Sequence, residues 1–287
     1  MTPAADVSWT IVAAVLFAAA CHAAWNAVIK IGIDPFARMV LVAVSSGVIA
    51  LPLVPLVGAP AMAAWPWLAV SGVIHLAYSV GLIESYRAGD LSQVYPIARG
   101  SAPLLTAVAS IVFVGDPIAP IAWAGIVLLG GGVLMLTARG GRDFARFDRR
   151  AVGFALFTAV TICAYSLVDG MGARRAGSAH AYVATFFVLY GVEMAALALA
   201  WRGAQILPLA GRYWKSGLAG GLLSFIGYWI VLWAMTKAPI AIVAALRETS
   251  VLFGTALAVT MLGEPLRALR VFAAVLIVAG LALVRLH

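Results

Sequence analysis

The stretch Tyr95-Pro96-Ile97-Ala98-Arg99-Gly100-Ser101-Ala102-Pro103 opens an apolar run that stops at Gly115-Asp116-Pro117. A second stretch, Ala245-Leu246-Arg247-Glu248-Thr249-Ser250, leads a similar run that stops at Gly263-Glu264-Pro265. Arg99 and Arg247 are 148 positions apart, and so are the two stops. An arginine inside an apolar run is costly in a membrane unless it is paired or faces water. Two matched arginines therefore predict a duplicated chain with a polar interior.

The composition indicates a membrane protein. Of the 287 residues, 64% are hydrophobic and 10% are charged, and the mean hydropathy is +1.05. A soluble domain carries roughly a quarter charged residues, and a membrane-spanning helix needs about 20 mostly apolar ones. We predict an all-α integral membrane protein whose ten transmembrane helices occupy residues 9–29, 36–57, 65–86, 91–114, 118–137, 151–171, 181–201, 216–235, 239–262 and 268–284.

Further matches extend the duplication along the chain. Leu16-Phe17 matches Leu156-Phe157 at an offset of 140, whereas Gly72 matches Gly220 and Gly132 matches Gly280 at 148. We therefore predict a first five-helix repeat over 1–140, an Arg-rich linker loop over 141–150 and a second five-helix repeat over 151–287. Because five is odd, the second repeat enters the membrane inverted. Inverted repeats place a substrate site near the midplane, between the two halves.

The net charge of +8 does not predict a nucleic-acid partner, because the Lys and Arg residues lie in short loops between apolar runs. In a membrane protein such charges set the orientation. Most of them fall in the odd-numbered loops, which predicts that both termini lie outside the cytoplasm. Cys21 and Cys163 both lie inside apolar runs, where cysteine is usually a small core residue. Four scattered histidines predict no metal site, and we expect no cofactor.

Polar and aromatic residues gather on helix faces in spans 1, 3, 4, 6, 8 and 9, since residues three and four apart share a face. The candidates for substrate binding are His22, Trp25, Asn26, Tyr78, Tyr95, Arg99, Tyr165, Tyr228, Arg247 and Glu248. Two acids are candidates for proton coupling: Asp169, which is a rare acid inside a span, and Glu84, which can instead pair with Arg87 at the membrane interface. Arginine binds carboxylate or phosphate bidentately, so the pair favours an anionic or zwitterionic substrate.

Several of these residues have a structural alternative. Arg99 can instead bond the carbonyl groups that Pro96 leaves free, and Arg247 can simply pair with Glu248 or with another acid across the repeat interface. Glu193, a rare acid on span 7 away from the other polar faces, is either a proton site or a helix–helix hydrogen-bonding residue.

Three stretches of this chain resemble the drug/metabolite transporter superfamily, EamA type: His22-Ala23-Ala24-Trp25-Asn26, Tyr95-Pro96-Ile97-Ala98-Arg99-Gly100 and Leu246-Arg247-Glu248-Thr249-Ser250. The two Gly-acid-Pro stops add to the resemblance, which covers nearly the whole length. It implies a ten-helix inverted-repeat carrier that works by alternating access, with a cavity lined by spans 1, 3, 4, 6, 8 and 9. The motifs also resemble a subgroup associated with phosphonate use. Several relatives keep both termini in the cytoplasm, whereas the loop charges here predict the opposite, and the orientation stays open.

The leading hypothesis is a secondary transporter of a small polar metabolite, such as an amino acid or a phosphonate, in a bacterial cytoplasmic (inner) membrane. The alternative is an exporter of amines or drugs in which the two arginines are structural. An intramembrane enzyme is disfavoured because the sequence has neither His-Glu-x-x-His nor Gly-x-Ser-x-Gly. A channel is disfavoured because no filter sequence repeats. The expected partners are a small-molecule substrate and the lipid bilayer, with the chain acting as a monomer or a homodimer.

Overall fold

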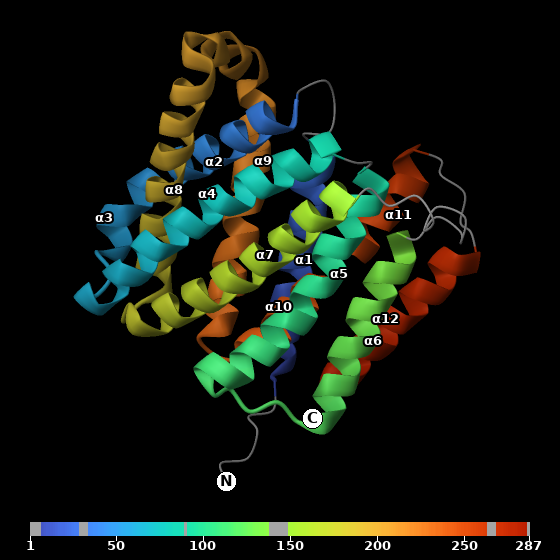
Figure 1. Cartoon of the computed structure of the whole chain (residues 1–287). Helices are drawn as coiled ribbons and strands as arrows, with labels where there is room; N and C mark the ends of the chain where they lie inside the picture. The colour runs from blue at the N-terminus through green and yellow to red at the C-terminus, as the bar shows by residue number, and fades with distance from the viewer. Residues whose placement is uncertain (1–6, 29–33, 89–90, 138–148, 263–267, 286–287) are drawn as a thin grey trace.

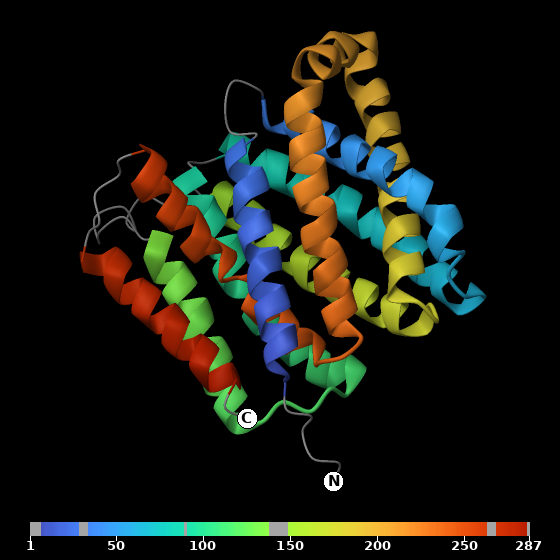
Figure 2. The same ribbon diagram turned by 180° about the vertical axis from the view of Figure 1, so that it is seen from behind.

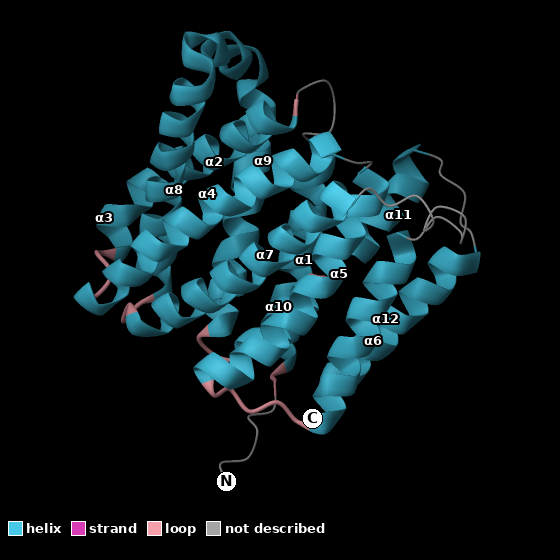
Figure 3. Cartoon of the chain, viewed as in Figure 1, coloured by secondary structure: helices cyan, strands magenta, loops and turns pink. Residues whose placement is uncertain are grey.

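The structure is a computed structural model that describes residues 7–28, 34–88, 91–137, 149–262 and 268–285. All the regular elements in these residues are helices, as Figure 3 shows. The predicted linker over 141–150 lies almost wholly outside the described residues, and so does the Gly263-Glu264-Pro265 stop.

The first repeat contains α1 (Trp9–Val28), α2 (Pro35–Ala50), α4 (Trp65–Ala88), α5 (Leu91–Ala109) and α6 (Pro120–Thr137). The short helix α3 (Val54–Val57) prolongs α2, and a π-helical turn over Ser110–Val114 prolongs α5. The second repeat contains α7 (Arg149–Arg175), α8 (Ala179–Arg202), α9 (Ile206–Met235), α10 (Ile240–Arg247), α11 (Ser250–Leu262) and α12 (Ala268–Arg285).

The helices confirm the predicted ten-span membrane fold. Eight stretches of the described residues are long and apolar enough to cross a membrane, and one of them, 179–235, contains both α8 and α9. The shorter apolar helix α6 supplies the tenth span. The end of α12 lies beside the start of α1, where the Arg285 guanidinium is 4.6 Å from the centre of the Trp9 ring. Both helices therefore reach the same side of the membrane (Figures 1 and 2).

Matched helix contacts show that the two repeats are related by a two-fold axis. Helix α4 packs on α7 just as α1 packs on α9, and α6 packs side by side with α12 (Figure 2). A Cβ atom built on Gly125 would lie 2.7 Å from the Gly280 carbonyl oxygen, and one built on Gly132 would lie 2.9 Å from that of Ala273. Gly125 and Ala273 are 148 positions apart, and so are Gly132 and Gly280. The two contacts therefore exchange with each other under the repeat.

Ion pairs join the repeats at both ends of the bundle. At the end where α2 begins, Asp34 caps that helix by accepting the backbone N–H of Phe36 at 3.0 Å. Arg202, which ends α8, donates to both Asp34 oxygens at 2.7 and 2.9 Å. At the opposite end, Arg174 binds Asp116 bidentately at 2.9 and 3.0 Å.

Spans 4 and 9 break differently from the sequence-based expectation. Proline inside a helix usually bends or breaks it, yet α5 runs through Pro96 and Pro103 without a break. Span 9, which contains no internal proline, is divided between α10 and α11 by a turn at Glu248 and Thr249. There the backbone N–H groups of Glu248 and Thr249 bond three residues back, to Ala245 and Leu246. At this tighter turn a Glu248 carboxylate oxygen lies 3.8 Å from Arg247.

Candidate functional site

A cavity of about 130 Å³ lies between the two repeats. Residues from α1, α2, α4, α7, α8, α9 and α10 line it, in the middle of the bundle and toward the end where α2 begins. Its polar and ring-bearing lining includes His22, Trp25, Ser46, His75, Tyr78, Tyr165, Phe186, Tyr190, Ser224, Tyr228 and Arg247.

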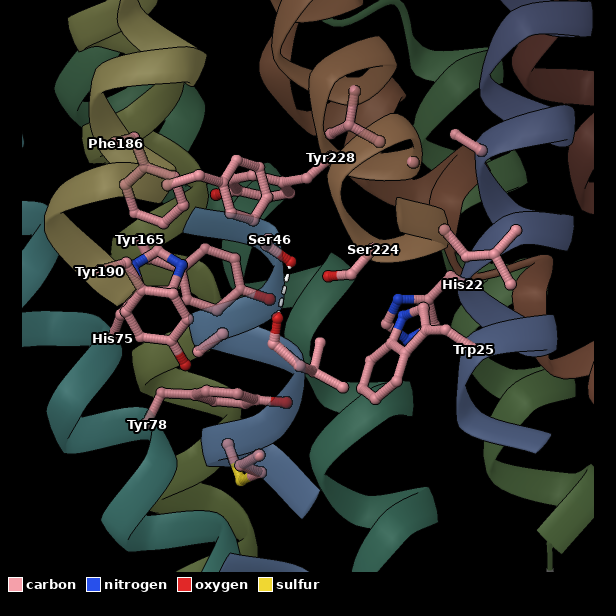
Figure 4. A pocket seen from close by; sticks show the side chains of 18 of the residues that line it. His22, Trp25, Ser46, His75, Tyr78, Tyr165, Phe186, Tyr190, Ser224 and Tyr228 are labelled. Carbon is pink, nitrogen blue, oxygen red and sulfur yellow. Dashed lines mark hydrogen bonds between the residues drawn. The ribbon is translucent and has the colours of Figure 1, made fainter. Parts of the chain in front are cut away.

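Aromatic rings form one continuous wall of the cavity. His75 stacks on Tyr165 with 4.5 Å between ring centres, and Tyr78 meets Tyr165 edge-on at 5.6 Å. Figure 4 shows this wall facing His22 and Trp25, with the hydroxyl groups of Ser46 and Ser224 between them. The cavity therefore offers broad ring faces and a few hydroxyl groups.

Among the described residues that line the cavity, Arg247 is the one that carries a permanent charge. The end of α10 presents it, and its side chain is only 6% exposed. One terminal nitrogen donates to the Tyr165 hydroxyl at 3.0 Å, and the guanidinium lies 5.6 Å from the centre of that ring. Its Nε atom is buried and has no hydrogen-bond partner in the described part of the chain. A buried donor of this kind is costly unless a ligand or water satisfies it.

Arg99 lies behind the cavity and bridges the repeats. Its Nε atom is 2.9 Å from a Glu248 carboxylate oxygen, and its Nη2 atom donates to the Ser250 hydroxyl at 3.0 Å. The other Glu248 oxygen is 3.8 Å from Arg247. The Glu248 carboxylate therefore lies close to the positive charges of both arginines. Its counterpart 148 positions earlier, in the first repeat, is Gly100 and carries no charge.

Asp169 is a fully buried carboxyl group next to the aromatic wall. It accepts hydrogen bonds from the hydroxyl groups of Tyr182, at 2.9 Å, and Tyr228. The nearest His75 nitrogen is 3.9 Å away. Two arginines and two carboxylates in this buried region give a formal charge of zero when both acids are ionised and the histidines are neutral.

Asp116 and Arg174 fix the end of the bundle where α7 and α9 finish. Besides their mutual bonds, Arg174 donates to the carbonyl oxygens of Met235 and Ala238 at 2.8 and 3.0 Å. Asp116 accepts the backbone N–H of Ile240, the first residue of α10, at 3.0 Å. This cluster ties the loop after span 4 to three helix ends of the second repeat.

Six of the predicted substrate-binding residues line the cavity: His22, Trp25, Tyr78, Tyr165, Tyr228 and Arg247. Asn26 instead donates to the His22 carbonyl oxygen within its own helix. Arg99 and Glu248 lie behind the lining, and the side chain of Tyr95 lies outside the described residues. Of the predicted proton-coupling residues, Asp169 lies behind Tyr228, whereas Glu84 lines a separate pocket with Phe36 and Arg202.

The lining differs from the six-span cavity that the resemblance implies. No described side chain of α5 belongs to it, whereas α2 and α8 contribute Ser46, Phe186 and Tyr190. Their helices reach the centre because Gly47 and Gly191 let α2 and α8 approach closely. A Cβ atom on either glycine would lie within 3.3 Å of the other's Cα atom. Two glycines at the middle of spans 2 and 7 are the sequence signal for this contact.

Two oppositely oriented five-helix repeats around a central cavity define an inverted-repeat membrane transporter. A family comparison agrees with this class. The chain belongs to the EamA-like transporter family, whose model matches residues 9–138 and 150–286. The two matched stretches correspond to the two repeats, and the chain is therefore a drug/metabolite-type transporter.

A solved crystal structure of another protein has the same fold. It shares 19% sequence identity with this chain, each chain is covered over 96% of its length, and the TM-score is 0.74. At this identity the similarity concerns the fold alone. Among curated proteins, none matches this chain in sequence.

Proposed function

We propose that this protein is a secondary transporter that moves a small metabolite with an anionic group, and that Arg247 binds that group. One observation carries the proposal: Arg247 is buried, lines the central cavity and keeps an Nε donor without a partner among the described residues. A carboxylate or phosphonate oxygen is the ligand that such a guanidinium prefers.

The buried charges favour a zwitterionic substrate or a monoanion. Glu248 already lies close to both arginines, and Asp169 is bound by two tyrosine hydroxyls. One added anionic group therefore leaves one negative charge in excess, and a dianion leaves two. A positive group on the substrate would rest against the ring faces of Tyr78, Tyr165 and Tyr228, which attract cations. Amino acids and amino-phosphonates have this distribution of charge.

Alternating access fits the two inter-repeat clamps. The cavity extends toward the end where Asp34 meets Arg202, and the Asp116–Arg174 cluster lies at the other end; both ion pairs are formed here. Breaking the two ion pairs one at a time would expose the site to each side of a bacterial cytoplasmic membrane in turn. Asp169 and Glu84 remain the proposed proton-coupling groups within this cycle.

Purified protein in proteoliposomes tests the proposal. Thermal shifts and counterflow are measured with panels of small carboxylates, amino acids and phosphonates. We expect at least one zwitterion or monoanion to stabilise the wild type and to exchange in counterflow, and Arg247→Gln to lose both effects. Arg212→Gln is the matched control, because Arg212 is an exposed arginine near the start of α9. Unchanged binding and counterflow in a folded Arg247→Gln protein would refute the role of Arg247.

A second candidate, an exporter of amines or drugs, is favoured by the aromatic wall itself. Ring faces bind quaternary and aromatic ammonium groups without any carboxylate, and the Arg99–Glu248–Arg247 group can serve as a structural tie. This candidate predicts stabilisation by tetramethylammonium or aromatic amines in both the wild type and Arg247→Gln. The same thermal-shift panel therefore separates the two functions.

A further inference from the structure

Glu193 places a carboxyl group in the seam between α8 and α4. A Cβ atom built on Gly72 of α4 would lie 2.3 Å from one Glu193 carboxyl oxygen and 2.8 Å from the other. The carboxyl group therefore occupies the space that any larger residue at position 72 would fill. Its side chain is half-buried, and its Oε2 atom is buried without a hydrogen-bond partner in the described part of the chain.

The other described carboxyl groups all have partners. Asp34 binds Arg202, Asp116 binds Arg174, and Glu248 binds Arg99. Asp169 accepts two tyrosine hydroxyls, and Glu84 also interacts with another group. Among the described acidic residues, Glu193 is thus the one for which the structure offers neither a hydrogen bond nor an ion pair.

A carboxylate without a partner is unstable at this depth. Transfer of an isolated ionised carboxylate into an apolar medium is so unfavourable that the group takes up a proton instead. We propose that Glu193 is a proton-binding site of the transport cycle, and that it must be protonated for α4 to pack against α8 as it does here. This inference rests on the transporter function but not on the identity of the substrate.

The equivalent seam under the two-fold relation, between α2 and α9, is closed by neutral groups. There the Ser46 hydroxyl of α2 donates to the Gly221 carbonyl oxygen of α9 at 3.0 Å, next to Gly220, the counterpart of Gly72. The α2–α9 seam is also the more extensive of the two. In an inverted-repeat carrier the two seams tighten and loosen in alternation. An acid in one seam and a hydroxyl in the other would make only one of these movements depend on a proton.

The titratable and charged groups around Glu193 are engaged elsewhere. On α4, His75 bonds Ser71 and stacks on Tyr165, and on α8 itself the Tyr190 hydroxyl meets that of Ser79. The groups on the other elements that pack against α8 include Arg38 of α2, Tyr228 of α9 and Asp169 of α7, while α3 has none. Helices α7 and α9 also carry titratable or charged residues that form no hydrogen bond or ion pair with Glu193 in the described part of the chain: Arg149, Arg150, Cys163, Tyr165, Arg174, Arg175, Arg212, Tyr213 and Lys215. Tyr228 and Asp169 bind each other, Arg38 lies more than two helical turns from Gly47, where α2 crosses α8, and none of the three forms an ion pair with Glu193.

A hydrophobic carbodiimide tests the protonation directly, because it adds to a protonated carboxyl group and leaves a stable N-acylurea. The purified full chain is treated with dicyclohexylcarbodiimide from mildly acidic to strongly alkaline pH, and the modified peptides are identified by mass spectrometry. We expect Glu193 to be modified at neutral pH, less so as the pH rises, and not at all in Glu193→Gln. Gly72→Ala, which displaces the carboxyl group, should change the labelling several-fold, whereas the control Gly153→Ala, with open space around its Cβ atom, should not.

Distance measurements then test the coupling without any substrate. Spin labels replace Val70 of α4 and Leu199 of α8, both exposed, in a protein whose Cys21 and Cys163 are changed to Ala. We expect the wild-type distance distribution to shift toward longer separations at alkaline pH, and Glu193→Gln to keep the short separation at every pH. The inference would be overturned if Glu193 were modified at none of the pH values tested. It would also be overturned if the spin-label distances of Glu193→Gln responded to pH as those of the wild type do. Neither result depends on whether Arg247 binds an anion.

Discussion

Replacement of Gly280 by alanine should weaken the contact that joins the two repeats through α6 and α12. The new Cβ atom would lie 2.6 Å from the Gly125 carbonyl oxygen and 2.8 Å from the Leu129 nitrogen, both of them backbone atoms. An ordinary contact requires about 3.4 Å, so the helices must separate by roughly 0.8 Å. A gap of that size removes a quarter to a half of the dispersion energy of each contact it opens.

We expect Gly280→Ala to lower the free energy of unfolding by about 1–3 kcal/mol, the usual range for an overpacked interior. Alanine's higher helix propensity offsets less than about 1 kcal/mol of this. The counterpart substitution Gly132→Ala should behave similarly, since its Cβ atom would lie 2.9 Å from the Ala273 carbonyl oxygen. The matched control is Gly131→Ala, whose Cβ atom would meet nothing within 4 Å.

The assay is unfolding of the purified protein in mixed micelles, followed by circular dichroism as the denaturing detergent fraction rises. A Gly280→Ala protein as stable as Gly131→Ala would refute the close packing of α6 on α12. A large loss in Gly280→Ala with none in Gly132→Ala would instead refute the equivalence of the two contacts.

Three further outcomes follow from named contacts. Asp116→Asn should destabilise the protein by about 1–3 kcal/mol in the same unfolding assay, because Arg174 loses its charge-assisted bonds, and an unchanged midpoint would contradict this. Tyr165→Phe keeps the ring but removes the acceptor for Arg247, so the melting temperature should fall, by an amount that corresponds to about 1.5–3 kcal/mol. Burial raises the pKa of Asp34, but the bonds from Arg202 and the helix N–H groups outweigh it, so the net pKa is lowered from 3.8. The ionised Asp34 should therefore stabilise the protein fully above about pH 3.8, and this stabilisation should be lost as the pH falls through the lower pKa that Asp34 has in the folded protein. Unfolding measured at a series of acid pH values should show this loss in the wild type but not in Asp34→Asn.

Much of the fold follows from the sequence because hydropathy and the 148-residue offset act over long stretches. Ten apolar runs give the spans, and the offset that relates Arg99 to Arg247 also relates Gly132 to Gly280, which lie in equivalent contacts. Helical periodicity likewise predicts the shared face of His22 and Trp25. These features depend on the spacing of residues along the chain, which can be read from a single sequence.

The division of roles between the two arginines could not be predicted in the same way. Arg247 faces the cavity because the helix breaks at Glu248, whereas Arg99 lies in the unbroken helix α5 and points behind the lining. Proline marks the wrong span, since Pro96 is accommodated without a break. Helical periodicity does not predict the contributions of α2 and α8 either, because it gives a helix its faces but not the neighbour that each face meets; Gly47 and Gly191 are the signal in the sequence for that contact.

The single carboxylate shared by Arg99 and Arg247 has a consequence for the history of the duplication. A hypothetical pair of first halves would bury two guanidinium groups with glycine in place of each acid, whereas a pair of second halves would carry one acid for each arginine. The first half has thus come to rely on a charge that the second half provides. When the two halves are expressed as separate chains, the first half should therefore form a stable protein together with the second half but not by itself. The dependence between the two halves runs in one direction.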